Sequence, residues 1–521
     1  MKLRDVLLAA LQSLPGTREF HIHVLVASPH KHHGLFPYAQ PRPRAYLQDI
    51  LILLSQQATP DAPRVFVTAV EVSVYNIPAT SCGILYVSKV DATGQATAPS
   101  PTATLIKSLL TYYTNPETRP IHIDTLWIQV FARSQGQYLF PNSSDHSGKR
   151  VLTDVKLCAW WKRNLSEVAA ETVARNAGVG MKLCYVLPGL SELEALNTLH
   201  FAASTPVPSS VQWTYGHQSS QTDIPLPCPP SKGTYNLGHS IPSFDDDPKS
   251  RFIDEIAHTT DGDGIRSPEA KRPKSALQQT NPKDRQGEDV DENKEEPRHQ
   301  GELDKVTPDE FWERMSFRQE CIAGAVTGFF WLGIAYPPPP ADSHNSSVPS
   351  PLAPQPGQVA PRLLKRVVAS LLNGYDFSTV KRAVRATETL EGVIRGLCEN
   401  IGSEPAEAKT DPYHLAPLLF QRETTPEPVR SSAVLEVPRT PKKGSKALPE
   451  VSPNPFPEPV ASLETYESYI YGSISVCNPP LPPKAGAVPA SNGVSGSGKD
   501  TPAAGQVTIL TVRKKKRKLE S

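Results

Sequence analysis

The chain has 521 residues, a formal net charge of +1 and 54 prolines, and only 38% of its residues are hydrophobic. This composition favours one substantial globular domain with long segments that bury little surface, and it argues against several compact domains. The balanced charge excludes a global electrostatic field for nucleic acid. The seven cysteines form no Cys-x-x-Cys pair and no cluster with histidine at ligand spacing. This argues against a disulfide framework and a structural zinc.

The first half of the chain predicts alternating helices and strands. Residues 1–11 contain Asp5 within an apolar run and lack a small-residue cleavage site, so they predict a short amphipathic helix and not a signal peptide. Residues 44–55 are interpreted as a helix. The other predicted elements are strands at 20–26, 65–75, 83–88 and 123–131 and helices at 104–113, 154–175 and 190–201. The strands at 65–75 and 83–88 are expected to be antiparallel neighbours. The alternation predicts an α/β fold with a central mixed sheet flanked by helices.

The second half is predicted to be interrupted by segments without structure. An ordered part, 1–258, is followed by a charged, disordered insertion at 259–306. Residues 307–336 begin with a helix capped by Thr307 and end in a second apolar run, 322–336. This run is shorter than the ~18–20 residues that span a bilayer, so it is interpreted as a buried helix. The remaining predicted segments are a Pro-rich linker at 337–361, helices within 362–401, disorder at 402–506 and a basic tail at 507–521.

Histidines gather near the N-terminus, but the pattern does not predict a metal site. His21 and His23 lie in a predicted strand, and His30, His32 and His33 follow in a loop flanked by Pro and Gly. No carboxylate or cysteine stands nearby at ligand spacing. No metal is therefore expected.

Residues 131–161 carry more of the chain's chemistry than any other stretch of this length. A predicted buried strand ends at Arg133, and Tyr138, Lys149, Arg150 and Trp161 follow. Guanidinium and ammonium groups bind phosphate, and Tyr and Trp rings form slots for a flat or apolar group. The stretch is therefore suited to a phosphorylated, partly apolar ligand. The alternative is structural, with solvated cations and a buried pair of tryptophans.

Three motifs in this order resemble one known family. They are Q-Y-L-F-P-N-S-S at 137–144 with the basic pair and Trp-Trp after it, L-Y-V-S-K-V-D-A-T-G at 85–94, and I-P-S-F-D-D-D-P-K-S-R-F-I at 241–253. The sequence resembles the fungal histone acetyltransferases called "regulator of Ty transposition", which share their fold with the CREB-binding-protein acetyltransferases. The resemblance extends from the N-terminus to about residue 400.

The resemblance implies that the chain binds acetyl-coenzyme A. The implied contacts are Tyr86, Ser88, Lys89, Arg133, Lys149, Arg150, Leu152 and Arg251, with the cations near the phosphates. Tyr138 and Trp161 would flank the target lysine, whose stem and ammonium suit an aromatic face. Taken alone, the 88–94 loop is an ordinary turn at the end of a strand.

The resemblance also implies a buried, autoacetylated lysine, which is Lys249 here, with Asp246 and Asp247 as its partners. An acidic turn with solvated carboxylates is the alternative. Asp91 and Asp247 are the candidates for binding or deprotonating the substrate lysine, whose usual pKa of ~10.4 leaves little free amine at neutral pH. Because no Ser or Cys lies in a nucleophile motif, direct attack in a ternary complex is expected.

The family's partners complete these expectations. The resemblance implies acetylation of histone three, on a lysine of its first core helix and on its N-terminal tail. It also implies cooperation with the anti-silencing-function chaperone, which presents the histone three–histone four dimer, and with a nucleosome-assembly-type chaperone, in nucleosome assembly during replication and the DNA damage response. The basic run 513–518 is typical of nuclear import. Two other classes stay open: a non-catalytic nuclear scaffold, and a nucleic-acid-binding protein that uses its basic tail. No membrane association is expected.

Overall fold

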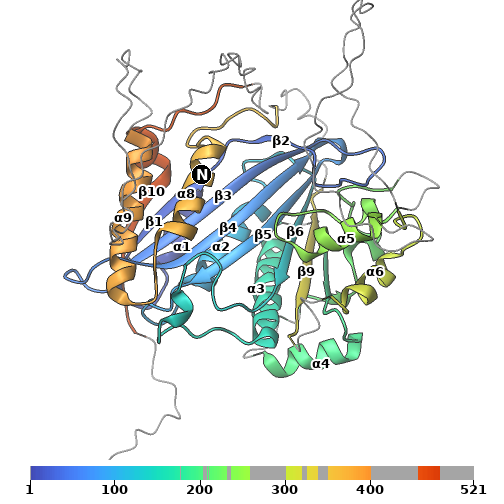
Figure 1. Cartoon of the computed structure of the whole chain (residues 1–521), viewed down its shortest axis with the longest axis horizontal. Coiled ribbons are helices and arrows are strands. Elements are labelled where there is room, and N and C mark those ends of the chain that lie inside the picture. The colour runs from blue at the N-terminus through green and yellow to red at the C-terminus, as the bar shows by residue number, and fades with distance from the viewer. Residues whose placement is uncertain are drawn as a thin grey trace, which may run out of the picture. The chain divides into compact units, whose positions relative to one another are not determined.

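The computed structural model describes residues 2–176, 178–203, 208, 210–230, 236–258, 301–318, 325–337, 350–399 and 456–480. Within these ranges the chain forms one mixed, ten-stranded sheet covered by helices on both faces (Figure 1). The predicted α/β class with a central mixed sheet is confirmed. No helix in the described ranges is long and apolar enough to cross a membrane.

The strands are β1 (Gly16–Val26), β2 (His30–His32), β3 (Ala45–Gln57), β4 (Val65–Ile77), β5 (Cys82–Ala92), β6 (Thr125–Ala132), β7 (Gly180–Val186), β8 (Trp213–Tyr215), β9 (Gly328–Ala335) and β10 (Tyr471–Asn478). Their spatial order is β10-β1-β3-β4-β5-β6-β9-β7-β8, and β2 pairs with β3. Among the described strands, β5·β6 and β7·β8 pair in parallel and the other pairs are antiparallel. The predicted antiparallel pairing of the strands at 65–75 and 83–88 is confirmed as β4·β5.

The helices are α1 (Leu3–Leu11), α2 (Thr102–Thr114), α3 (Asp154–Arg175), α4 (Glu192–Ala202), α5 (Pro248–His258), α6 (Pro308–Met315), α8 (Pro361–Gly374), α9 (Val380–Glu399) and the single turn α10 (Leu463–Thr465). The first four pack on one face of the sheet. On the other face, α5 and α6 cover one end and α8 and α9 cover the other, as Figure 1 shows. Thr307 caps α6 as predicted, since its hydroxyl accepts from the N–H of Glu310.

Two predicted helices are strands. Residues 44–55 fall in β3, where Ile50, Ile52 and Leu54 face one core and Leu51 and Leu53 face the other. The apolar run at 322–336 contains β9, whose side chains also alternate between two cores. A strand that is buried on both faces reads as a continuous apolar run, and such a run does not distinguish a strand from a buried helix.

Some segment boundaries also differ from the predictions. Residues 456–480 lie within a region predicted to be disordered, but they form α10 and β10, and β10 pairs with β1. Residues 301–306 close the predicted charged insertion, yet Leu303 and Val306 are buried. The rest of that insertion and the basic tail lie outside the described residues.

Candidate active site

The candidate site lies where β5 and β6 end. These two strands are parallel and are connected through α2, so their carboxyl ends lie side by side at the same end of the sheet. A cavity of 760 Å³ opens there. It is lined by every predicted site residue except Asp247 and Lys249: Tyr86, Ser88, Lys89, Asp91, Arg133, Tyr138, Lys149, Arg150, Leu152, Trp161, Asp246 and Arg251. Residues that are far apart in the sequence therefore share one cavity.

Asp91 holds the loop that follows β6. One carboxylate oxygen accepts from the backbone N–H groups of Tyr138, Leu139 and Phe140 at 2.8, 2.8 and 3.0 Å. The other oxygen accepts from Nζ of Lys149 at 2.8 Å. A carboxylate that accepts from this many donors is held in one orientation. The geometry therefore favours a positioning role for Asp91 over proton abstraction.

The sequence predicted a loop at 88–94, but β5 continues to Ala92, and the turn after it touches the loop at 146–150 through the backbone. Gly94 has φ +78, and a Cβ built there would lie 2.4 Å from the Cα of Lys149. Only glycine fits both this conformation and this close approach. The contact fixes the distance between the two loops that line the cavity.

The cations of the cavity fall into two groups. Lys149 pairs with Asp91, and Lys89 pairs with Glu71 at 2.9 Å and with Asp246 at 3.3 Å. Burial lowers the pKa of Lys89, but the two carboxylates outweigh this effect and raise the pKa above its usual value. Both lysines are therefore engaged by the protein.

The arginines are the better candidates for phosphate. Arg133 and Arg150 form no ion pair within the described residues, and Arg251 reaches the cavity from α5. Leu152 is 39% exposed beside them, and its carbonyl accepts from the Ser134 hydroxyl. Guanidinium groups next to an exposed apolar side chain suit a ligand with phosphates at one end and an apolar portion at the other.

Aromatic side chains form the other walls. Trp161 is buried and contacts Trp160 edge-on, with ring centroids 4.9 Å apart. The Tyr138 hydroxyl donates to the carbonyl of Arg133, and burial raises the pKa of Tyr138 to about 12. Tyr138 therefore stays protonated at neutral pH and cannot act there as a base.

Tyr86 stacks on Phe244, a residue that the sequence did not single out. Their ring centroids are 4.0 Å apart and their planes differ by 9°. Phe244 also lies 5.1 Å from Nζ of Lys249. It thus connects the wall of the cavity to the buried lysine behind it. Glu71, which pairs with Lys89, was missed as well, because a carboxylate inside a predicted core strand gives no local signal.

Lys249 is buried at the start of α5. Its Nζ pairs with Asp247, and the side chains of Lys249 and Asp247 are 3% and 0% exposed. Burial lowers the pKa of Lys249, and the Asp247 carboxylate opposes that shift. Of the two predicted partners, only Asp247 pairs with Lys249. Asp246 is 79% exposed, has a left-handed backbone (φ 60) and pairs with Lys89 instead.

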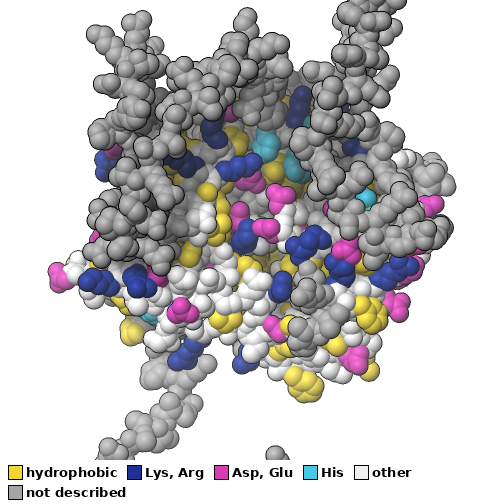
Figure 2. Space-filling view, in the orientation of Figure 1, with side chains coloured by type: hydrophobic (Ala, Val, Ile, Leu, Met, Phe, Trp, Pro, Cys, Tyr) yellow, Lys and Arg dark blue, Asp and Glu magenta, His cyan; other side chains and the backbone are white. Residues whose placement is uncertain are grey.

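Charges of both signs surround the site. On the face of the molecule drawn in Figure 2, Lys and Arg side chains lie next to Asp and Glu side chains over the described residues. No group of three or more His, Cys, Asp or Glu side chains in the described ranges is arranged to hold a metal ion. The cavity offers aromatic walls, a fixed loop and two guanidinium groups that form no ion pair with any residue that the structure describes.

The family whose pattern is described as the histone acetyltransferase KAT11-type domain matches residues 120–392. The chain belongs to this family. It is 28% identical over 306 residues to histone acetyltransferase rtt109 of Aspergillus flavus, which covers 53% of this chain and 46% of that protein. It is 24% identical over 264 residues to histone acetyltransferase rtt109 of Schizosaccharomyces pombe, covering 49% of this chain and 53% of that one. The chain thus matches about half the length of these relatives.

The fold agrees with this assignment. The crystal structure of Rtt109 from Aspergillus fumigatus superposes with a TM-score of 0.55 at 23% identity, covering 76% of this chain and 96% of that one. The resemblance found in the sequence motifs is therefore confirmed for both the family and the fold.

Proposed function

We propose that the protein is a histone lysine acetyltransferase that uses acetyl-coenzyme A. One observation carries the proposal: in a chain of the KAT11-type family, three separate sequence motifs line a single cavity at the ends of β5 and β6. Arg133, Arg150 and Arg251 would bind the phosphates of coenzyme A. The apolar and aromatic wall, with Leu152 and Trp161, would cover the pantetheine arm and the stem of the target lysine.

The transfer would proceed by direct attack. The neutral lysine amine attacks the thioester carbonyl carbon, a C–N bond forms, the C–S bond breaks, and coenzyme A leaves as a thiolate that takes up a proton. Asp91 and Asp247 each hold a lysine of the protein itself. We therefore assign them to positioning the site. We assign deprotonation of the substrate to water, because removing the lysine ammonium from solvent in the cavity lowers its pKa.

The substrate and setting follow the family resemblance. We propose that the acceptors are lysines of histone three, in its first core helix and its N-terminal tail, presented as a histone three–histone four dimer by an anti-silencing-function chaperone. A nucleosome-assembly-type chaperone would bind the enzyme. The setting would be nuclear, in replication-coupled nucleosome assembly and the DNA damage response. Lys249 would be autoacetylated, since acetylation removes a charge that is costly to bury.

Acetyl transfer to the chaperone-bound histone dimer tests the proposal, with mass spectrometry of the histone lysines and of Lys249. The double variant Arg133→Gln/Arg150→Gln should weaken acetyl-coenzyme A binding in calorimetry, while Arg382→Gln, on exposed α9 surface, should not. A folded wild-type chain that binds no acetyl-coenzyme A and transfers nothing would support the non-catalytic scaffold instead. Steep salt-dependent DNA affinity that is lost with residues 513–521 would support the nucleic-acid-binding class.

A further inference from the structure

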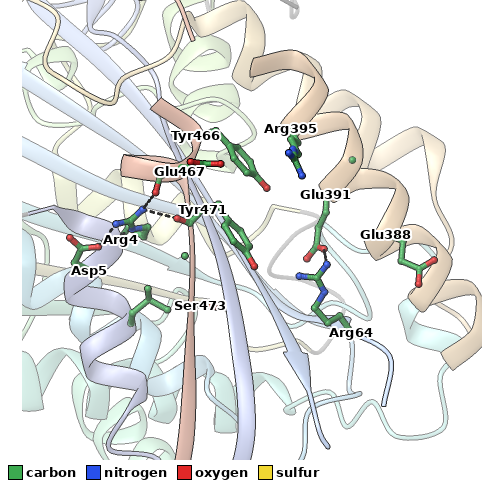
Figure 3. Close-up of a pocket in the computed structure, with 13 residues that line it drawn as sticks. Arg4, Asp5, Arg64, Glu388, Glu391, Arg395, Tyr466, Glu467, Tyr471 and Ser473 are labelled. Carbon is green, nitrogen blue, oxygen red and sulfur yellow. Dashed lines mark hydrogen bonds and ion pairs between the residues drawn. The ribbon is translucent and has the colours of Figure 1, made fainter. Parts of the chain in front are cut away.

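A second cavity, of 840 Å³, lies beside β10 at the edge of the sheet. Its walls come from α1, α9 and the segment that ends in β10. Figure 3 shows Glu388, Glu391 and Arg395 of α9 on one side of the open space, and Arg4, Glu467 and Ser473 on the other. The cavity therefore runs along the start of a sheet edge, between a helix on each face of the sheet.

The outer edge of β10 carries backbone groups that bond to no strand in the described part of the chain. Ala27, just after β1, donates its N–H to the carbonyl of Asp49 in β3. On the opposite side, Ser28 donates its N–H to the carbonyl of Val359, and the carbonyl of Val26 accepts from the N–H of Val359. Backbone groups alternate in direction along an antiparallel strand, so the even residues of β1 face β10. The register pairs Ile22 with Gly472 and Phe20 with Ile474. Ser473, Ser475 and Cys477 therefore point their N–H and C=O groups outward.

This edge has few of the features that usually protect one. Charged residues, prolines and bulges normally prevent a sheet edge from pairing with another chain. The β10 sequence Y-G-S-I-S-V-C-N contains no charged residue and no proline. Arg4 covers only its first carbonyl, that of Tyr471, at 2.6 Å. The edge beyond it can accept an added strand.

Four carboxylates and three arginines line the cavity, and this excess of negative charge favours a basic partner. Arg4 pairs with Asp5 at 2.7 Å, Arg64 with Glu391 at 2.9 Å and Arg395 with Glu399 at 3.0 Å. This leaves the carboxylates of Glu388 and Glu467, which form no ion pair within the described residues. They lie on opposite walls, on α9 and on the segment before β10.

We propose that the outer edge of β10 binds an extended segment of the basic protein substrate, which adds a strand to the sheet and places a Lys or Arg side chain between Glu388 and Glu467. Backbone hydrogen bonds to Ser473, Ser475 and Cys477 supply affinity, and the two carboxylates supply the preference for a basic side chain. The inference rests on the proposed function for the identity of the substrate. It adds a contact that is separate from the acetyl-coenzyme A cavity.

Binding of a fluorescent histone three–histone four dimer to the full chain tests the inference at low and high salt. Glu467→Lys should weaken binding by about two- to fivefold for each unit of charge that it changes, and the effect should be larger at low salt. Glu464→Lys is its matched control, because Glu464 is exposed on the same segment but does not line the cavity. Ser475→Pro removes an outward N–H and should weaken binding by roughly two- to tenfold. Ser475→Ala should not.

Each result decides something. If Glu467→Lys and Glu464→Lys bind the dimer equally, or if the wild-type chain does not bind it, the inference is wrong. If Ser475→Pro lowers the melting temperature more than Ser475→Ala does, its weaker binding is attributed to lost stability. The comparison of Glu467→Lys with Glu464→Lys then tests the inference. Acetyl-coenzyme A affinity and transfer to a short lysine peptide should be unchanged in all four variants. If the wild-type chain binds the dimer but transfers no acetyl group, the proposed activity is refuted and the contact at the sheet edge still stands.

Discussion

Replacing Asp91 separates a positioning role from proton abstraction. Asp91→Ala removes both oxygens that fix the 138–140 loop and Lys149. Three backbone N–H groups lose their acceptor, and the ammonium of Lys149, whose side chain is 8% exposed, loses its carboxylate partner. The loop should move away from the cavity wall.

The size of this effect follows from the contacts. A buried donor left without an acceptor costs about 1–3 kcal/mol, and a buried ion pair broken by removing one partner costs about 3–5 kcal/mol. These contributions overlap, because water enters the space that the carboxylate leaves. We expect Asp91→Ala to lower the free energy of unfolding by about 3–5 kcal/mol. Asp91→Asn keeps one oxygen for the loop N–H groups but also breaks the ion pair with Lys149, so it should lose less than Asp91→Ala does.

Urea unfolding, acetyl-coenzyme A calorimetry and acetyl transfer should be measured on the same preparations. A positioning role predicts that stability, affinity for acetyl-coenzyme A and transfer fall together, and that all three fall further in Asp91→Ala than in Asp91→Asn. If Asp91→Ala keeps wild-type stability and affinity while transfer disappears, Asp91 is the proton acceptor and the assignment made here is wrong.

Three further predictions concern the neighbouring contacts. Gly94→Ala should lower acetyl-coenzyme A affinity at least about tenfold by calorimetry, whereas Gly178→Ala, at φ +80 in open space, should cost only about 1 kcal/mol of stability. Lys249→Met leaves Asp247 buried and unpaired and should cost about 3–5 kcal/mol in urea unfolding, which Asp247→Asn in the same chain should largely restore. Burial lowers the pKa of His23 from 6.5 to about 3 in the folded chain. As the pH falls from 6.5 toward 3, this histidine takes up a proton in the unfolded chain but not in the folded chain, so the folded chain loses stability over this range. His23→Gln should flatten that part of the stability curve, and the exposed His122→Gln should not.

The fold was predictable where the pattern was periodic. The helix α3 and the strands β4 and β5 show clear periodicity, and the structure confirms them. The errors at β3 and β9 have one physical cause: both strands are buried on both faces, so polar residues do not alternate with apolar ones. β10 was missed because a strand with no large apolar side chains other than Ile474 and Val476 gives little signal next to long polar segments.

The site was predictable as a set of residues but not as a set of contacts. The motifs named the residues that line the cavity. They did not show that Lys89 and Lys149 are already engaged by Glu71 and Asp91. Such pairs join residues that are 18 and 58 positions apart. The β4·β5 register brings the first pair together, and the close contact of Gly94 with Lys149 brings the second together. The sequence therefore did not distinguish the cations that pair with carboxylates of the chain from Arg133 and Arg150, which form no ion pair within the described residues.

The extent of the domain follows from the same contacts. The family match covers residues 120–392, but Asp91 and Gly94, which fix the cavity loops, come before it. At the other end, the N–H of Phe377, between α8 and α9, donates to the carbonyl of Pro141 at 2.9 Å, and its ring packs on Phe140. The loop that Asp91 holds from one side is thus supported from the other by the C-terminal helices. A fragment that begins at residue 120 would keep the arginines and lose the carboxylate that orders the loop between them, so the functional unit must include β5.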